Sequence, residues 1–331
     1  MALGPHKMEY EVVEGWERMP EGMAFTEVVG VAVDSKDRVY VFTRGAHPVI
    51  VFDKEGKFLD AWGQGMFVRP HGLFMTRDDQ LFLVDDEGHA VHRCSLDGKL
   101  LQKIGDGAPS DTGYQPKKAP VAKAAGPFNA VTNVAVNAAG EIYAADGYGN
   151  ARVHKFSASG ELLFSWGEQG SGPGEFNLPH GIALDSQGRV YVADRENCRV
   201  QIFTPEGQYI SEWGWVNRPC DIFIDGQDNI YIAELGFNFG VGDAPHLRLL
   251  RKPPEGHSPL ARVTVTNPDG EIIRQIGGEE AILPGNFIAP HGIWVDSKGA
   301  FYVGEVVVAS GAAKHFAPLT PHAFQKFQRG G

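Results

Sequence analysis

The chain has 331 residues, 43% of them apolar, and a formal net charge of −11, which fits either two ordinary domains or one large all-β or repeat domain. The acidic balance, without any basic run, argues against nucleic acid or an anionic membrane as the partner. No segment has the roughly 18 to 20 apolar residues of a membrane span, and the N-terminus has no apolar stretch of signal-peptide length, so we expect a cytoplasmic protein, although a chain trimmed of its leader would look the same.

A two-strand pattern recurs six times along the chain. In each unit an alternating apolar strand, as in 182–184, leads through an Asp/Gly turn, as in 185–188, into a second strand, as in 190–192. Alternation of β-branched and aromatic residues between such turns predicts β-hairpins. The first strands of the six units begin at Val29, His71, Thr132, His180, Cys220 and His291.

Most units continue with a third and a fourth strand, and the fourth usually ends in Trp or Ile followed by Gly. Four strands per unit, with a period of about 42 to 47 residues, are typical of a β-propeller. The sixth unit lacks one strand, and the N-terminal segment 10–16 can supply it and remove an open sheet edge. We therefore predict one all-β domain over residues 1–331, a six-bladed β-propeller with approximate blades 25–63, 67–105, 128–167, 176–214, 217–277 and 287–331 plus 8–16.

Three insertions interrupt the repeat, at residues 106–127, 235–258 and 306–322. The first lies between two blades, and the other two separate the second and third strands of their blades. In an up-and-down blade these connections lie on the face where the first strands begin. Long loops gathered over one face of a rigid scaffold commonly form a binding site, so we expect a small-molecule substrate there.

Three of the first strands open with the same tripeptide, Pro-His-Gly, at His71, His180 and His291. Because these are alternate blades, the three imidazoles are expected to converge on the central axis. Three neutral imidazoles with an open fourth position are a ligand set for catalytic zinc, and iron, cobalt or manganese could use the same ligands. The alternative is that His-Gly only opens a strand and the imidazole binds loop carbonyls. Cys220 is a possible fourth ligand, although a small buried residue is the simpler interpretation.

An acidic residue follows each of these histidines by fourteen positions, at Asp85, Asp194 and Glu305. Positions with that separation face each other across a hairpin, so these carboxylates could orient the imidazoles. Glu234 and Asp146 occupy the same place in blades without the histidine. The acid could therefore equally be a feature of the repeat.

Just beyond that acid the repeats differ from one another, and three residues there are candidates for catalysis. Arg44 and Arg195 could hold a carboxylate or carbonyl of a substrate, and Tyr148 could move a proton beside a metal. The alternative is that they are solvated loop residues and partners of a salt bridge between blades.

The remaining cysteines and histidines show no shared pattern. Cys94, Cys198 and Cys220 are an odd number without CxxC spacing, which suits a reducing compartment. The other histidines share no register, and we expect the following to be surface or loop residues: His47, His89, His154, His246, His257 and His315.

The chain resembles the NHL-repeat propellers, above all in the stretches ADGYGNARVHKF and LPHGIALDSQGRVYVADRENCRVQIF. Within that group it resembles the peptidyl-α-hydroxyglycine α-amidating lyases. The resemblance implies that His71, His180 and His291 surround a catalytic zinc. It also implies that Tyr148 is the active-site tyrosine and that Arg44 and Arg195 are the two active-site arginines.

The sequence departs from that family at several points. The family's structural calcium uses an Asp directly after the last histidine, where this chain has Gly292, together with carbonyls matching Val31 and Leu73, so the sequence argues against a calcium there. Gly149 stands where the family has a disulfide-bonded cysteine beside the tyrosine, and we expect no fused monooxygenase domain.

We therefore expect a zinc-dependent lyase that cleaves a carbinolamide-like or other hydroxylated small substrate. A hydrolase or hydratase on the same metal remains an alternative. A further alternative is a non-catalytic NHL propeller that binds a protein or glycan. A calcium lactonase would need carboxylate and Asn ligands at the axis, where the register reads Val, His, Thr, His, Cys, His. No residue pattern indicates the oligomeric state.

Overall fold

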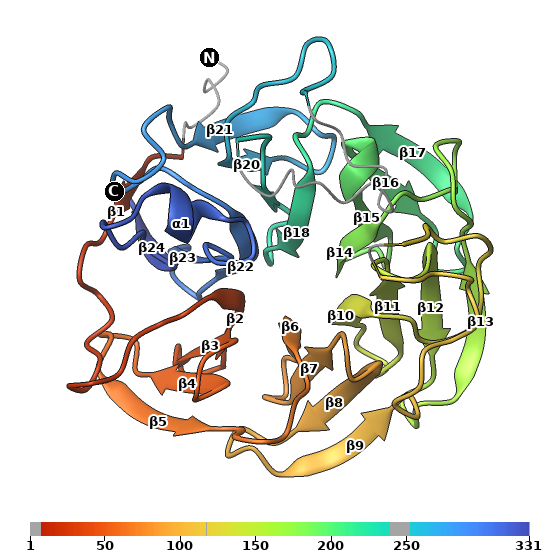
Figure 1. Ribbon diagram of the computed structural model, residues 1–331, viewed down its shortest axis with the longest axis horizontal. Coiled ribbons are helices and arrows are strands. Elements are labelled where there is room, and N and C mark those ends of the chain that lie inside the picture. Colours follow the sequence, from red (N-terminus) through yellow and green to blue (C-terminus); the bar gives the residue numbers. More distant parts are fainter. Residues whose placement is uncertain (1–7, 117, 239–251, 331) are drawn as a thin grey trace.

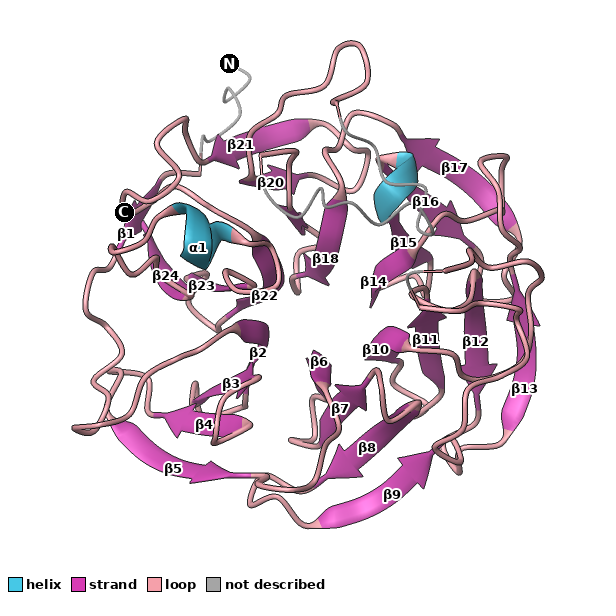
Figure 2. Cartoon of the chain, viewed as in Figure 1, coloured by secondary structure: helices cyan, strands magenta, loops and turns pink. Residues whose placement is uncertain are grey.

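In the computed structural model, which describes residues 8–116, 118–238 and 252–330, the strands form six four-stranded antiparallel sheets around a central axis (Figure 1). The six-bladed propeller expected from the repeat is confirmed. Among the described residues the only helices are two short segments, the 3-10 turn η1 (Arg195–Asn197) and α1 (Ala312–His315), as Figure 2 shows. None of these helices has the length and apolar composition that crossing a membrane requires.

Each blade presents its first strand to the axis and its last strand to the outer rim (Figure 1). The axial strands are β2 (Val28–Val33), β6 (Pro70–Met75), β10 (Val131–Val136), β14 (Pro179–Leu184), β18 (Pro219–Ile224) and β22 (Pro290–Val295). The second strands are β3 (Val39–Thr43), β7 (Leu81–Asp85), β11 (Ile142–Asp146), β15 (Val190–Asp194), β19 (Ile230–Glu234) and β23 (Phe301–Glu305). The third strands are β4 (Val49–Phe52), β8 (Ala90–Cys94), β12 (Arg152–Phe156), β16 (Arg199–Phe203), β20 (Arg262–Thr266) and β24 (Phe324–Arg329). The outer strands are β5 (Phe58–Trp62), β9 (Leu100–Ile104), β13 (Leu162–Trp166), β17 (Tyr209–Trp213), β21 (Ile272–Ile276) and β1 (Tyr10–Val12).

Burial explains why the strands differ in composition. Every residue of β2 and of β15 is buried, because neighbouring blades cover both faces of the inner strands, and both strands accordingly carry mainly Val and Ala, with a Tyr in β15. The outer strand β17 is exposed except at Trp213 and carries Tyr, Ser and Glu. The apolar core therefore lies between the blades, as sheet-on-sheet packing.

The N-terminal segment closes the ring, as expected. β1 pairs antiparallel with β24, with Tyr10 opposite Arg329 and Val12 opposite Phe327. The strand is shorter than the expected segment 10–16, because Trp16 leaves the sheet and packs its ring against Phe52 and Tyr302. This pairing covers the last edge of the sixth blade.

The insertions lie on the face where the axial strands begin. In the first of them, Thr112 donates a hydrogen bond to the carbonyl of Gly149 at 2.6 Å, so the insertion packs on the loop that carries Tyr148. In the third, the backbone N–H of Ala309 donates to Glu27, just before β2. Of the insertion 235–258, residues 239–251 lie outside the described part of the chain.

Candidate metal centre

The structure brings the three predicted histidines together on the axis. His71, His180 and His291 occupy the second positions of β6, β14 and β22 and are all buried. Their ring centroids are 4.7 to 4.8 Å apart, and the ring nitrogens that could hold a metal lie within 4.8 Å of one another. In the described part of the chain, these three are the His, Cys, Asp or Glu side chains that lie close enough together to hold a metal ion.

The hydrogen bonds of the imidazoles define which nitrogen faces the axis. Nδ1 of each ring lies next to a backbone carbonyl of the following blade, at 2.7 Å for His71 and Thr132, 2.7 Å for His180 and Cys220, and 2.8 Å for His291 and Val29. A carbonyl only accepts, so Nδ1 carries the hydrogen and Nε2 keeps its lone pair. Each Nδ1 thus binds a carbonyl of a neighbouring axial strand, where the strand-opening alternative expected a loop carbonyl, and Nε2 keeps a lone pair that a metal could use.

The electrostatics keep these imidazoles neutral. Burial lowers the pKa of His71 and His180 well below the ordinary value and lowers the pKa of His291 to about 3. Positive neighbours add to the effect of burial, chiefly Arg195 for His180 and Arg44 for His291. Metal ions bind the neutral imidazole, so the three side chains are in the required protonation state at neutral pH.

Tyr148 lies directly beside the triad, in the loop between β11 and β12. Its hydroxyl is 3.1 Å from Nε2 of His71 and 3.3 Å from Nε2 of His180. Because both nitrogens are acceptors, the hydroxyl donates. The loop is held by the N–H of Gly149, which donates to the carbonyl of Asn129 at 2.9 Å.

Arg44 approaches the same centre from the first blade. Its Nε donates to the carbonyl of Pro70 at 3.0 Å, one residue before His71, and its Nη1 pairs with Glu27 at 3.2 Å. Its Nη2 is buried and has no hydrogen-bond partner among the described residues. A buried donor without a partner is costly, and a bound oxygen ligand would satisfy it.

Arg195 belongs to a buried group of three charged side chains. Its Nε donates to Glu196 at 2.8 Å, and the same carboxylate accepts from Arg218 at 2.9 and 3.1 Å. All three residues are buried, and two guanidiniums share one carboxylate, so the group has a net charge of +1. The guanidinium carbon of Arg195 is 5.5 Å from the centroid of the Tyr148 ring, which places this positive charge beside the triad.

The carboxylates of Asp85, Asp194 and Glu305 have other partners than the imidazoles. Asp85 accepts from the backbone N–H groups of Val68 and Arg69, both at 2.8 Å, in the loop that leads into β6. Asp194 and Glu305 likewise accept from the N–H groups of residues 177, 288 and 289. The repeat interpretation of this acid therefore fits, and these carboxylates make no hydrogen bond to the imidazoles of the triad among the described residues.

A β-bulge is the physical reason. The pairing places Pro70, Pro179 and Pro290 opposite the acids, and the register shifts immediately afterwards. The histidine that follows each proline therefore leaves the ladder and points to the axis.

Two other expectations need correction or refinement. His154 is not a surface residue, because it is buried in β12 with Nε2 3.2 Å from Asp146 and Nδ1 2.7 Å from Ser165. The thiol of Cys220 is not part of the convergent group among the described residues, and this cysteine contributes its carbonyl to His180 instead.

Several residues of the site escaped the sequence reasoning, namely Glu27, Arg69, Glu196 and Arg218. The two arginines had a signal, because each stands directly before the proline that opens an axial strand. Glu27 had none, since it directly precedes β2 while its partner Arg44 directly follows β3, 17 residues further along the chain.

One layer below the histidines, a polar pair crosses the axis. Nδ2 of Asn133 donates to Asp221 at 2.8 Å, and the other carboxylate oxygen accepts from the N–H of Ile293 at 3.1 Å. At Gly292, where the related family has its calcium-binding Asp, a Cβ would lie 2.7 Å from the Cα of Gly30. The chain thus places its axial carboxylate on the fifth blade, with a neutral amide as its side-chain partner.

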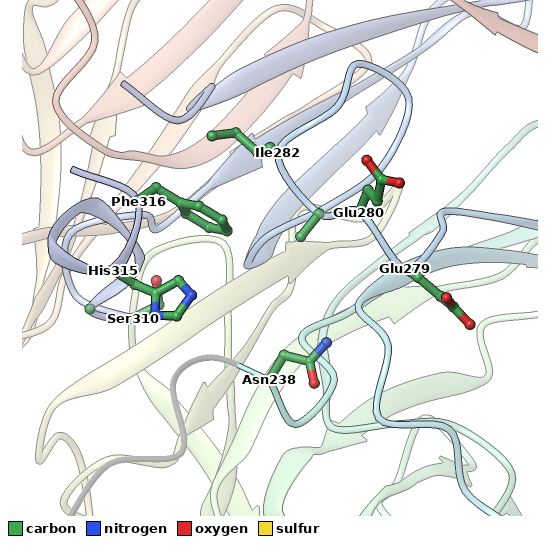
Figure 3. A pocket seen from close by; sticks show the side chains of 9 residues that line it. Asn238, Glu279, Glu280, Ile282, Ser310, His315 and Phe316 are labelled. Atoms are coloured by element: carbon green, nitrogen blue, oxygen red, sulfur yellow. The ribbon is translucent and has the colours of Figure 1, made fainter. Parts of the chain in front are cut away.

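A cavity of about 680 Å³ lies on the same face, between loops of the fifth and sixth blades (Figure 3). Ser310, His315 and Phe316 line one side, and Glu279 and Glu280 lie across from them (Figure 3). None of its described lining residues belongs to the histidine centre.

Known proteins share the repeat and much of the chain. Residues 176–203 match the NHL repeat. NHL repeat-containing protein 3 of Homo sapiens is 31% identical over 318 residues, which cover 91% of this chain and 82% of the human protein. A probable peptidyl-α-hydroxyglycine α-amidating lyase of Caenorhabditis elegans is 34% identical over 160 residues, which cover 47% of this chain and 43% of that protein.

A solved structure shares the fold. Virginiamycin B lyase from Staphylococcus aureus superposes with a TM-score of 0.55 over 90% of this chain and 82% of that chain, at 14% identity. At this identity the likeness concerns the propeller architecture.

Proposed function

The chain belongs to the NHL-repeat family of β-propellers, and from this premise we propose that it is a metal-dependent lyase acting on a small hydroxylated substrate of the N-acyl-α-hydroxyglycine class. The worm relative is named for this reaction, and the residues around the axis have the chemistry that it needs. The site supports a lyase best because a phenol contacts two of three metal-competent imidazoles and two arginines lie next to this group.

The three histidines fit a divalent transition metal, with zinc as the expected ion. Their Nδ1–H groups are bound by carbonyls, their Nε2 lone pairs face inward, and burial keeps them neutral. When bound, such an ion supplies Lewis acidity toward a hydroxyl or carbonyl oxygen.

Tyr148 is suited to move the proton of the reaction. Cleavage of R–CO–NH–CH(OH)–COO⁻ breaks the bond between nitrogen and the carbinol carbon, and the electron pair goes to nitrogen. The hydroxyl oxygen loses its proton and becomes the aldehyde carbonyl, while nitrogen gains a proton and leaves as the amide. The Tyr148 hydroxyl lies within hydrogen-bond distance of Nε2 of both His71 and His180. We assign it the transfer of the proton from the substrate hydroxyl to the leaving nitrogen.

Arg44 and Arg195 are suited to position the substrate. Nη2 of Arg44 is a buried donor without a partner among the described residues, and a substrate carboxylate would satisfy it. Arg195 lies against the Tyr148 ring, and Glu196 holds it in place. The positive charge of both groups favours a substrate with an anionic end.

The observation that carries the proposal is the contact of the Tyr148 hydroxyl with Nε2 of both His71 and His180. The test is incubation of the metal-loaded protein with N-benzoyl-α-hydroxyglycine, followed by quantification of benzamide and glyoxylate. Equal amounts of both products, lost in His180→Ala, support the lyase. Benzoate in place of benzamide would instead support a hydrolase on the same site, because amide hydrolysis releases α-hydroxyglycine, which itself breaks down to glyoxylate and ammonia.

A second candidate is a non-catalytic propeller that binds a protein or glycan. The human relative that covers most of this chain carries a name that describes a repeat and no reaction. This candidate predicts that the metal-loaded protein cleaves no hydroxyglycine substrate and that His71→Ala leaves partner binding intact.

A further inference from the structure

Arg69 lies at the entrance to β6, two residues before His71, and is fixed at several points. Its N–H donates to Asp85 at 2.8 Å, and its carbonyl accepts from the N–H of Asp86 at 3.2 Å. Its Nη1 donates to the buried carboxylate of Asp86 at 2.8 Å and lies 3.7 Å from Glu87. A guanidinium anchored along one edge loses little freedom when it binds a ligand with the other.

This guanidinium borders the centre described above. Its carbon lies 5.8 Å from the centroid of the Tyr148 ring, and Arg195 lies 5.5 Å from the same centroid. The next residue, Pro70, offers its carbonyl to Arg44. Arg69 is therefore a further arginine at the site, and its side chain is 32% exposed where that of Arg44 is 12% exposed.

The outer edge of Arg69 is available for a ligand. Within the described residues its hydrogen bonds and ion pairs use Nη1, toward Asp86 and Glu87. Nε and Nη2 form the planar fork that matches the two oxygens of a carboxylate. Glu27 is the further acid whose charge acts on Arg69, and it is bound to Arg44.

The repeat itself shows that the fold does not require an arginine at this position. The residues in the same place before the other two Pro-His-Gly segments are Leu178 and Ala289, which are both buried and apolar. The strand entrance is therefore built equally well without a charge. Arg69 differs from these two residues because its side chain is charged and partly exposed, and it lies beside the Tyr148 ring.

We propose that Arg69 is a specificity-determining residue that binds an anionic group in the acyl part of the substrate. The inference rests on the proposed function, in which Arg44 serves the carboxylate of the hydroxyglycine. Arg69 lies further out, so its ligand is a second carboxylate. The preferred substrates are then hydroxyglycine-extended peptides with an acidic residue directly before the hydroxyglycine.

The test compares N-acetyl-Asp-α-hydroxyglycine with N-acetyl-Asn-α-hydroxyglycine, which differ by one charge at equal size. The wild type is expected to prefer the Asp substrate about five- to tenfold in kcat/KM, through KM. Arg69→Gln should bring the ratio to about one, and Arg69→Lys should retain part of the preference because a lysine keeps the charge without the planar fork.

Arg38 provides a matched control on the opposite face. Its side chain is 33% exposed, pairs with the buried Asp34 and lies 6.0 Å from the Tyr40 ring, so it reproduces the environment of Arg69 away from the site. Arg38→Gln should leave the Asp to Asn ratio unchanged. A ratio that is the same in the wild type and in Arg69→Gln overturns the proposal.

A binding measurement separates this proposal from the lyase itself. N-acetyl-Asp-Gly and N-acetyl-Asn-Gly lack the hydroxyl and cannot be cleaved, so calorimetric titration reports recognition alone. If the protein prefers the Asp peptide only when Arg69 is present, but cleaves no hydroxyglycine substrate, the role of Arg69 in recognition stands and the lyase activity is refuted. A wild type that binds neither peptide, or both equally, contradicts the role of Arg69.

Discussion

Gly72 lies against the carbonyl of Thr132, the same carbonyl that accepts Nδ1–H of His71. A Cβ on Gly72 would be 2.6 Å from that oxygen, and one on Gly181 would be 2.6 Å from the carbonyl of Cys220, which holds His180. The glycine of each Pro-His-Gly therefore lets the next blade come close enough to orient the imidazole. The requirement is close approach, since Gly72 does not adopt a left-handed conformation.

Gly72→Ala should weaken the metal site through this contact. The backbone of Thr132 must move to accept the Cβ, which costs about 1 to 3 kcal/mol of unfolding free energy. Loss of the carbonyl partner of His71 should reduce metal affinity by about 10- to 100-fold, measured by competition with a chelator. Gly226→Ala is the control, because a Cβ there meets nothing within 4 Å. Equal metal affinity in Gly72→Ala and wild type would refute the orienting role of this carbonyl.

The variant Tyr148→Phe should keep its bound metal but lose most of its lyase activity. The hydroxyl is the group of Tyr148 that reaches the triad, and removal of a positioned acid or base typically costs about 10² to 10⁴ in rate. The measurement is kcat together with metal content on the same sample. Tyr143→Phe is the matched control, since that buried hydroxyl binds the carbonyl of Pro205 in an outer turn. Activity within twofold of the wild type in Tyr148→Phe would exclude its role as proton carrier.

The fold follows from the sequence because every blade repeats one alternating pattern between turn residues, and the two inner strands are buried on both faces. The histidine triad follows as well, since the three tripeptides stand at one register on alternate blades. The carboxylate partners do not follow, because the bulge after Pro70 moves His71 out of the ladder and leaves Asp85 opposite the proline. The roles of Tyr148, Arg44 and Arg195 stay predictions, although Tyr148 contacts two of the histidines, Arg195 lies beside its ring and Arg44 binds the carbonyl next to His71.

Contacts between distant blades could not be predicted from the sequence either. Asn133 and Asp221 are 88 residues apart and meet only because the ring closes. Arg69 and Arg218 share the position before a strand-opening proline, yet one is partly exposed and the other is fully buried.

Asp221 should give the stability of the protein a measurable pH dependence. Burial raises the pKa of its carboxyl from 3.8 to about 7, and the described residues in contact with it provide hydrogen bonds and no cation. A folded-state pKa above the unfolded one means that this contribution is fully present below pH 4 and is lost as pH rises toward 7.

Asp221→Asn removes the ionisation. The unfolding free energy of this variant relative to wild type should therefore rise between pH 4 and 7, by an amount on the order of a few kcal/mol. Urea unfolding of the wild type and the variant measures this difference in unfolding free energy. Asp60→Asn is the control, because the side chain of Asp60 is exposed. A difference that does not change over this interval would show that Asp221 does not titrate as its burial implies.

Metal content tests the central claim most directly. The protein, purified without a metal-affinity tag and analysed by inductively coupled plasma mass spectrometry, should hold about one divalent transition metal per chain. The same analysis of His180→Ala should give less than about 0.2 per chain, because the triad loses one of its three ligands. Less than about 0.2 per chain in the wild type, unchanged in His180→Ala, would contradict the metal centre and the lyase built on it.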